Sequence, residues 1–190
     1  QKVIDGARAV LDNYRPHIPI QTDWPMVELR EVCELGGTIT KKIDGSLPSF
    51  GADSIETNTG KLLKQESAEM QGVRGPVYEF DGERLLYSKI RPYLNKLTVV
   101  NLRGYCSSDM YPLAVDPRKA DIRFLATYML SSTFNDAIRG FYERASIPKI
   151  NQSQLFKTRI PLPVVKTQRA IVAEIEVEQA LVNANRELIS

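Results

Sequence analysis

Between Trp24 and about residue 165, apolar residues occur in short runs that are interrupted by glycine, proline, asparagine and aspartate. Runs of about four to eight residues between such turn-forming residues are typical of β-strands. This region is therefore predicted to consist mainly of strands. They are MVEL (26–29), LPSF (47–50), RLLYS (84–88), LTVV (97–100) and MYPLAV (110–115), and ETNTGK (56–61) predicts a hairpin or tight turn.

Helical spacing appears at both ends of the chain. Apolar residues recur at helical intervals in residues 1–14, and Pro16 ends this helix, which is too short to be stable without packing. Residues 166–189 predict a longer helix with two apolar stripes. Either one stripe contacts the chain's own domain and the other a second helix, or both form one broad core face. The stripes are Ile171, Ile175, Val182 and Ile189, and Ala170, Val177, Leu181, Ala184 and Leu188.

The β-rich region also contains helical segments near its end. Residues 121–139 predict two helices that are separated near Ser131 and Ser132. Asp121 and Ser132 are the predicted N-caps, because short polar side chains accept hydrogen bonds from the free N–H groups of a first turn. Asn151 is predicted to cap a further helical turn. The apolar face expected in the core is Phe124, Leu125, Tyr128 and Met129.

These patterns together predict an α/β or α+β fold: a curved, mostly antiparallel sheet system with peripheral helices and a long, coiled-coil-type C-terminal helix. The 190 residues are enough for one sizeable core. No run of about 18 apolar residues predicts a membrane span, and no signal peptide is recognisable. We expect a cytoplasmic protein. Because the chain begins with Gln1 and ends within a helical pattern, we expect it to be part of a longer one.

The sequence contains no complete catalytic signature. The GxGxxG and GxSxG motifs are absent, and Gly60-Lys61 lacks the earlier glycine and the following hydroxyl residue of a P-loop. His17 is the only histidine, which disfavours Ser-His and Cys-His catalysis. An enzyme complete within this chain is therefore not expected.

A metal site is not expected either. Cys33 and Cys106 lie outside any CxxC motif, so we expect two buried free thiols rather than zinc ligands. Asp81 and Glu83 would share one face of a strand and, with Asp109, have the chemistry to hold a cation. Solvated acidic residues are the commoner arrangement, and we favour it here.

Basic residues are clustered, although the net charge is only +2. Residues 84–108 contain five lysines and arginines and no acid, and residues 144–173 contain six and no acid. Local patches determine attraction to a polyanion more than the net charge does. On charge alone, nucleic-acid binding and two solvated loops explain the clusters equally well.

Four segments resemble the target recognition domain of type I restriction–modification specificity subunits. The resemblance covers nearly the whole chain, and the order and spacing of the segments make it specific. Glu83 replaces the family's usual aspartate, and Val164 replaces the second proline of its usual pair. The segments are WPMVELREVCELGGTI (24–39), FDGERLLYSKIRPYLNK (80–96), ASIPKINQSQLFKTRIPLP (145–163) and VKTQRAIVAEIE (165–176).

The resemblance implies a division of labour. Such a subunit has no catalytic centre, and each of its two recognition domains reads half of a bipartite duplex DNA site. Its spacer helices pair with another helix of the intact chain or of a second copy, and they dock methyltransferase subunits. Those partners bind S-adenosylmethionine, so no cofactor is expected on this chain, and a motor-nuclease subunit cleaves DNA. The implied divisions are a preceding helix and linker (1–22), the recognition domain (23–165) and the next spacer helix (166–190).

The candidate DNA contacts lie on four polar segments. Lysines suit phosphates, arginine can bond guanine with two hydrogen bonds, and asparagine can do the same with adenine. Pro92 is expected to stiffen the first segment and so reduce the ordering cost of binding. The candidates are Ser88, Lys89, Arg91, Tyr93, Asn95 and Lys96; Arg144, Ser146, Lys149 and Asn151; Lys41 and Lys42; and Arg74.

Two alternatives remain open. Tyr87, Tyr93, Tyr105 and Tyr111 have the aromatic faces with which a single-strand or RNA binder stacks bases. Tyr87 and Tyr111 lie within predicted strands, however, where packing in the core is the simpler explanation. The other alternative is an interaction module that uses the long helix and does not contact DNA. A surface that binds nucleic acid without sequence preference is also compatible with the sequence.

Overall fold

The strands form two larger sheets and a two-stranded ribbon in the computed structural model, which describes residues 17–143 and 145–188. The strands are β1 (Met26–Glu28), β2 (Cys33–Leu35), β3 (Thr38–Thr40), β4 (Pro48–Phe50), β5 (Glu66–Ser67), β6 (Val77–Phe80), β7 (Glu83–Ser88), β8 (Leu97–Asn101), β9 (Gly104–Ser107), β10 (Met110–Val115) and β11 (Arg159–Pro161). The helices are α2 (Ile122–Leu130), α3 (Ser132–Arg139), α4 (Gln152–Lys157) and α5 (Val165–Leu188), with 3-10 turns η1 (Leu29–Glu31), η2 (Ala52–Ser54) and η3 (Pro92–Leu94).

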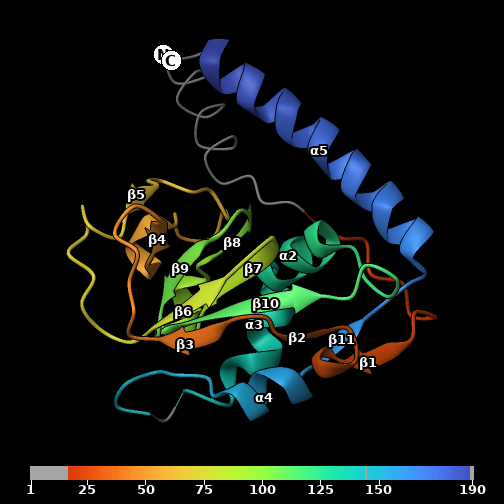
Figure 1. Ribbon diagram of the computed structural model, residues 1–190. Coiled ribbons are helices and arrows are strands. Elements are labelled where there is room, and N and C mark those ends of the chain that lie inside the picture. Colours follow the sequence, from red (N-terminus) through yellow and green to blue (C-terminus); the bar gives the residue numbers. More distant parts are fainter. Residues whose placement is uncertain (1–16, 144, 189–190) are drawn as a thin grey trace.

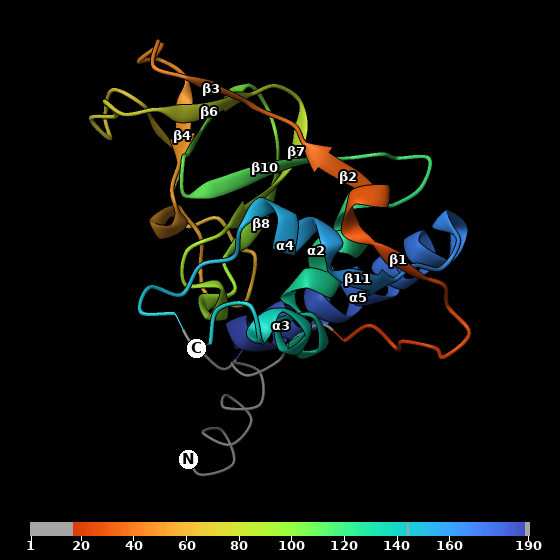
Figure 2. The ribbon, with the colours of Figure 1, turned by 90° about the horizontal axis from the view of Figure 1, so that it is seen from below.

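The two sheets and the shorter helices are arranged in layers (Figure 1). The four-stranded sheet has the order β2-β10-β7-β8, and the five-stranded sheet has the order β3-β6-β9-β4-β5. Figure 2 shows α2, α3 and α4 on the side of the four-stranded sheet that faces away from the five-stranded sheet. Of the described strand pairs, β4 with β9 is parallel and the others are antiparallel. The predicted fold class is confirmed.

Strand β7 is buried on both faces. Leu85 and Tyr87 contribute to the core between the four-stranded sheet and the helices, and Leu86 to the core between the two sheets. Successive side chains of a strand point to opposite faces, so a strand between two layers reads as a continuous apolar run. This arrangement explains why RLLYS shows no alternation of polar and apolar residues.

Most of the predicted elements are present in the structure. All five predicted strands exist, and the backbone of Glu56 donates to that of Lys61 in the predicted tight turn. Asp121 caps α2 by accepting hydrogen bonds from the N–H groups of Arg123 and Phe124, and Asn151 caps α4. Cys33 and Cys106 are buried free thiols, as expected.

The predicted cap of the second helix was wrong by one residue. Ser131, not Ser132, accepts a hydrogen bond from the N–H of Phe134, at 3.3 Å. Both serines suit a cap, and the position is decided by Ser131 having an extended backbone. The helix predicted for residues 1–14 lies outside the described residues.

Helix α5 leaves the domain as a long extension (Figure 1). Ile171, Val172 and Ile175 are buried against the domain, so the first predicted stripe packs there in its first half. Val177 and Leu181 of the second stripe are 62% and 61% exposed. The single broad core face is therefore excluded for this part of the helix. None of the helices in the two described ranges is long and apolar enough to cross a lipid bilayer.

Candidate nucleic-acid interface

Two of the predicted basic segments lie side by side. Ile90 and Lys149 form an isolated antiparallel bridge. The N–H of Arg91 donates to the carbonyl oxygen of Pro148 at 2.8 Å, and the N–H of Ile150 donates to that of Lys89 at 3.0 Å. We call residues 88–96 and 145–151 the tethered loops. The second of them follows α3 in the long loop at the lower left of Figure 1, away from α5.

The tether brings like charges together. The Lys89 ammonium lies 5.0 Å from the centroid of the Tyr111 ring, within reach of a cation–π interaction. Partial burial lowers the pKa of Lys89, and the nearby charge of Lys149 lowers it further. Mutual repulsion of two ammonium groups makes the site more favourable for a ligand that carries negative charge.

The turn between β7 and β8 is held in an unusual backbone conformation. Arg91 and Asn95, on either side of η3, both have a φ of 49°, in the left-handed region that non-glycine residues rarely adopt. Each such residue costs of order 1 kcal/mol and persists only where its surroundings hold it. Asn95 is held in this conformation because its side-chain amide donates a hydrogen bond to the carbonyl oxygen of Leu130 at 2.8 Å. The result is a fixed turn from which Tyr93, 51% exposed, projects into solvent.

The structure corrects two of the predicted DNA contacts. Asn95 and Ser88 are each only 3% exposed. The Asn95 amide is used within the fold, and the Ser88 hydroxyl donates to the carbonyl oxygen of Ile90 at 3.1 Å. Burial and these bonds prevent both side chains from reaching a base edge. Residue type alone gave no sign of this, because both are polar residues in a polar loop.

Two further candidates have roles within the fold. The Lys96 ammonium donates to the carbonyl oxygen of Ala52 at 2.8 Å and is partly buried. The Asn151 side chain accepts from the N–H of Gln154 at 2.9 Å as the cap of α4. Arg91, Ser146 and Lys149 are exposed, and Arg144 lies outside the described residues.

The first tethered loop lines a groove of about 790 Å³, which we call the loop groove. Its walls come from both sheets, because loops around β4, β6, β7 and β9 meet there. Its lining includes Ala52, Asp53, Gly75, Pro76, Ser88, Arg91, Lys96, Ser107, Ser108, Asp109 and Ile147.

The remaining predicted cations lie at one end of the five-stranded sheet. Thr40 pairs with Val77, so Lys41 and Lys42 follow β3 at the same end of the sheet at which Arg74 precedes β6. Gly75 and Pro76, next to Arg74, line the groove itself. Lys41, Lys42 and Arg74 are all exposed. The segment that contains Arg74 thus borders the loop groove together with the two tethered loops.

The structure also adds two residues that the sequence did not predict as DNA contacts. Ile147 is 68% exposed and lines the loop groove beside Arg91. Its only signal in the sequence is its position in the polar segment ASIPKIN, where an exposed isoleucine is unusual. Asp109 contributes an exposed carboxylate to the same groove. Cations, a carboxylate and an apolar side chain together can meet phosphates, amino groups and methyl groups.

The acidic cluster considered from the sequence does not form a metal site in the described residues. Within residues 17–143 and 145–188, no three histidine, cysteine, aspartate or glutamate side chains are grouped so as to hold a metal ion. Asp81 and Glu83 are both exposed.

Tyr87 and Tyr111 are 1% and 5% exposed, which confirms that they pack in the core.

Comparisons with known proteins give consistent matches. The family described as type I restriction modification DNA specificity domain matches residues 21–184. The specificity subunit of the type I restriction enzyme EcoDI from Escherichia coli is 33% identical over 162 residues, which are 85% of this chain and 35% of that protein. This chain therefore spans about a third of the length of that relative.

Solved structures share the fold. The HsdS subunit from Thermoanaerobacter tengcongensis has a TM-score of 0.73 at 23% identity, over 94% of this chain and 47% of that one. A chain from a structure of the assembly and conformational transition of the type I R-M system has a TM-score of 0.75 at 22% identity, over 90% of this chain and 46% of that one.

Proposed function

Because the chain belongs to the family of type I restriction modification DNA specificity domains, we propose that it reads one half of a bipartite duplex DNA site. The observation that carries this proposal is the hydrogen-bonded tether between residues 88–96 and 145–151. It concentrates Lys89, Arg91 and Lys149 at one edge of the molecule. A surface that merely needed to be soluble would gain nothing from holding these cations together against their repulsion.

The mechanism we propose combines anchoring with base readout in the major groove. Lys41, Lys42, Arg74 and Lys149 bind phosphates and set the position of the duplex. Arg91 donates two hydrogen bonds to a guanine, and Asp109 accepts one from a cytosine or adenine amino group. The fixed turn around η3 supports this role, because a loop that is already ordered loses little entropy on binding.

The remaining partners are proposed from the family. The whole protein would carry a second recognition domain and would dock methyltransferase subunits, which bind S-adenosylmethionine, and a motor-nuclease subunit. Cleavage and methylation would take place on those subunits, in the cytoplasm, and this chain would bind no cofactor. The exposed residues Val177 and Leu181 suit α5 for pairing with another helix of the intact chain or of a second copy.

The same exposed stripe favours a second candidate function, a helix-mediated interaction module without DNA contact. The two functions predict different effects of removing loop cations. A DNA reader loses affinity for duplex DNA, whereas an interaction module without DNA contact has no such affinity to lose. A titration of this chain with a random-sequence duplex at several salt concentrations therefore separates them.

We expect Lys149→Ala to weaken binding to all duplexes and to make the slope of log affinity against log salt shallower by about 1, because one phosphate contact is lost. Arg118→Ala is the matched control, since Arg118 is an exposed arginine outside the loop groove that pairs with Asp116 at 2.9 Å. An unchanged slope in Lys149→Ala, or an equal loss in Arg118→Ala, would contradict the proposed surface.

A further inference from the structure

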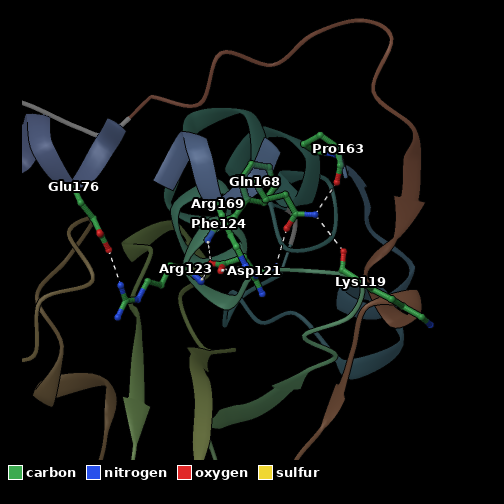
Figure 3. Close-up of polar contacts among 8 residues, drawn as sticks. All are labelled: Lys119, Asp121, Arg123, Phe124, Pro163, Gln168, Arg169 and Glu176. Atoms are coloured by element: carbon green, nitrogen blue, oxygen red, sulfur yellow. Dashed lines mark hydrogen bonds and ion pairs between the residues drawn. The ribbon is translucent and has the colours of Figure 1, made fainter. Parts of the chain in front are cut away.

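One buried amide connects α5 to the rest of the domain (Figure 3). Gln168, in the first turn of α5, is fully buried. Its Oε1 accepts a hydrogen bond from the N–H of Asp121 at 2.8 Å. Its Nε2 donates to the carbonyl oxygens of Pro163 at 2.7 Å and Lys119 at 3.2 Å. Both donors and the acceptor of the amide are thus used, and all three partners are backbone groups.

Two of these backbone groups belong to the point at which α2 begins, whereas Pro163 lies in the link between β11 and α5. Lys119 and Asp121 lie in the connection between β10 and α2, and the Asp121 side chain caps α2. The same short segment therefore starts one helix and holds the base of another. Outside the buried amide, Arg123 pairs with Glu176 at 2.8 Å, and Arg169 approaches Asp121 at 3.7 Å (Figure 3).

The three kinds of contact constrain α5 to different extents. The apolar contacts of Ile171, Val172 and Ile175 hold the helix against the domain, but hydrophobic attraction has no preferred direction. The ion pair of Arg123 with Glu176 is exposed, and such pairs contribute less than about 1 kcal/mol; Arg169 approaches the partly buried Asp121 only at 3.7 Å. Hydrogen bonds depend on direction, so the two from Gln168 to the backbone of Lys119 and Asp121 favour one orientation of the helix, and the third, to Pro163, holds the link into α5.

A small change in the angle at the base of α5 produces a large displacement of its far end. The 24 residues of α5 correspond to about 36 Å at 1.5 Å per residue. A rotation of about 10° at the base would move the far end by roughly 6 Å. That distance is close to two base-pair steps of about 3.4 Å each along a duplex.

We infer that Gln168 is a positioning residue that sets the angle at which α5 leaves the domain. The angle is a property of this chain alone. Its consequence for DNA rests on the proposed function: a fixed angle holds the half-site reader at a defined separation from whatever α5 joins. Gln168 lies outside the loop groove, so this role is separate from base readout.

Spin labels at Ala137→Cys on α3 and Ala180→Cys on α5 measure the angle as a distance between two exposed positions. The native Cys33 and Cys106 do not compete for label, because both are buried and burial raises the pKa of Cys33 to about 12. For the otherwise unchanged chain we expect one narrow distance distribution. Gln168→Met keeps the side-chain length without hydrogen bonds. It should broaden the distribution or shift it by roughly 3 Å for a rotation of about 10°, because Ala180 lies about 18 Å along the helix from Gln168.

Two further variants control this result. Arg123→Ala removes the exposed ion pair and should leave the distribution unchanged. Gln168→Asn keeps the amide on a shorter stem that cannot reach all three backbone partners, and it should also broaden the distribution. Thermal unfolding by circular dichroism establishes which variants are folded. If Gln168→Met is not folded, Gln168→Asn serves as the test.

An unchanged distribution in a folded Gln168 variant would overturn the inference. The same broadening in Arg123→Ala would also overturn it, because the ion pair would then set the angle. The measurement contains no DNA, so its outcome is independent of the proposed function. Conversely, Lys149→Ala should lose affinity for DNA while keeping the wild-type distance.

Discussion

At the scale of single residues, burial decides what a polar side chain does. Asn95 and Lys149 occupy similar polar loops, yet Asn95 is buried and bonded to Leu130, whereas Lys149 is exposed. The sequence made both residues candidate DNA contacts because of their type and their position in polar segments. It did not indicate which of them face inward, because that depends on α2 supplying the carbonyl oxygen of Leu130 from 35 residues away.

Tyr87 gives a prediction at this scale. Among the described residues its hydroxyl is buried and has no hydrogen-bond partner, and burial raises the pKa of Tyr87. An unpaired buried polar group costs about 1–3 kcal/mol. Tyr87→Phe should therefore keep the edge-on contact with Phe134, at 6.4 Å between ring centroids, and raise the free energy of unfolding by about 1 kcal/mol.

Urea denaturation measures this change, and Tyr128→Phe provides a comparison at another buried tyrosine of the same core that also contacts Phe134. A loss of stability of 1 kcal/mol or more in Tyr87→Phe, on the order of a lost hydrogen bond, would mean that the hydroxyl has a partner after all.

At the scale of elements, the sequence predicted the helices and their core faces well, but it did not predict the residue at which each element begins and ends. The predicted face of α2 is in the core, because Phe124, Leu125, Tyr128 and Met129 are all buried. Strands β6 and β9 are among the strands that were not predicted. In β6 the half-exposed Glu79 interrupts the apolar run, and β9 is only four residues long, so their pairing with each other defines them.

The cap of α3 provides the prediction at this scale. Ser131 accepts from the N–H of Phe134, whereas Ser132 is the first residue of the helix and is exposed. Ser131→Ala should lower the free energy of unfolding by about 1 kcal/mol, the usual contribution of a serine cap. Ser132→Ala should change it by less than about 0.5 kcal/mol. Chemical denaturation of both variants compares neighbouring serines directly, and an equal effect would show that the cap is shared.

At the scale of the whole molecule, the decisive contacts are those between distant segments. Residues 88–96 and 145–151 were separate candidates in the sequence, and no local pattern indicates that the backbone of Arg91 bonds that of Pro148. The β1–β11 ribbon likewise joins Met26 to Pro161. Such pairings depend on how the layers pack, which is why the sequence predicted the class of fold but not the shape of the candidate site.

The central claim is that this assembled surface reads a DNA sequence, and selection from a pool of random duplexes tests it most directly. The chain would be incubated with the pool at about 100 mM salt, where binding through phosphates alone is partly suppressed. We predict enrichment of one motif of roughly three to five base pairs, the length that a single reading module contacts. Arg91→Ala should relax the preference at one position of that motif. A pool that binds without enrichment, or one that does not bind at all, would contradict the account.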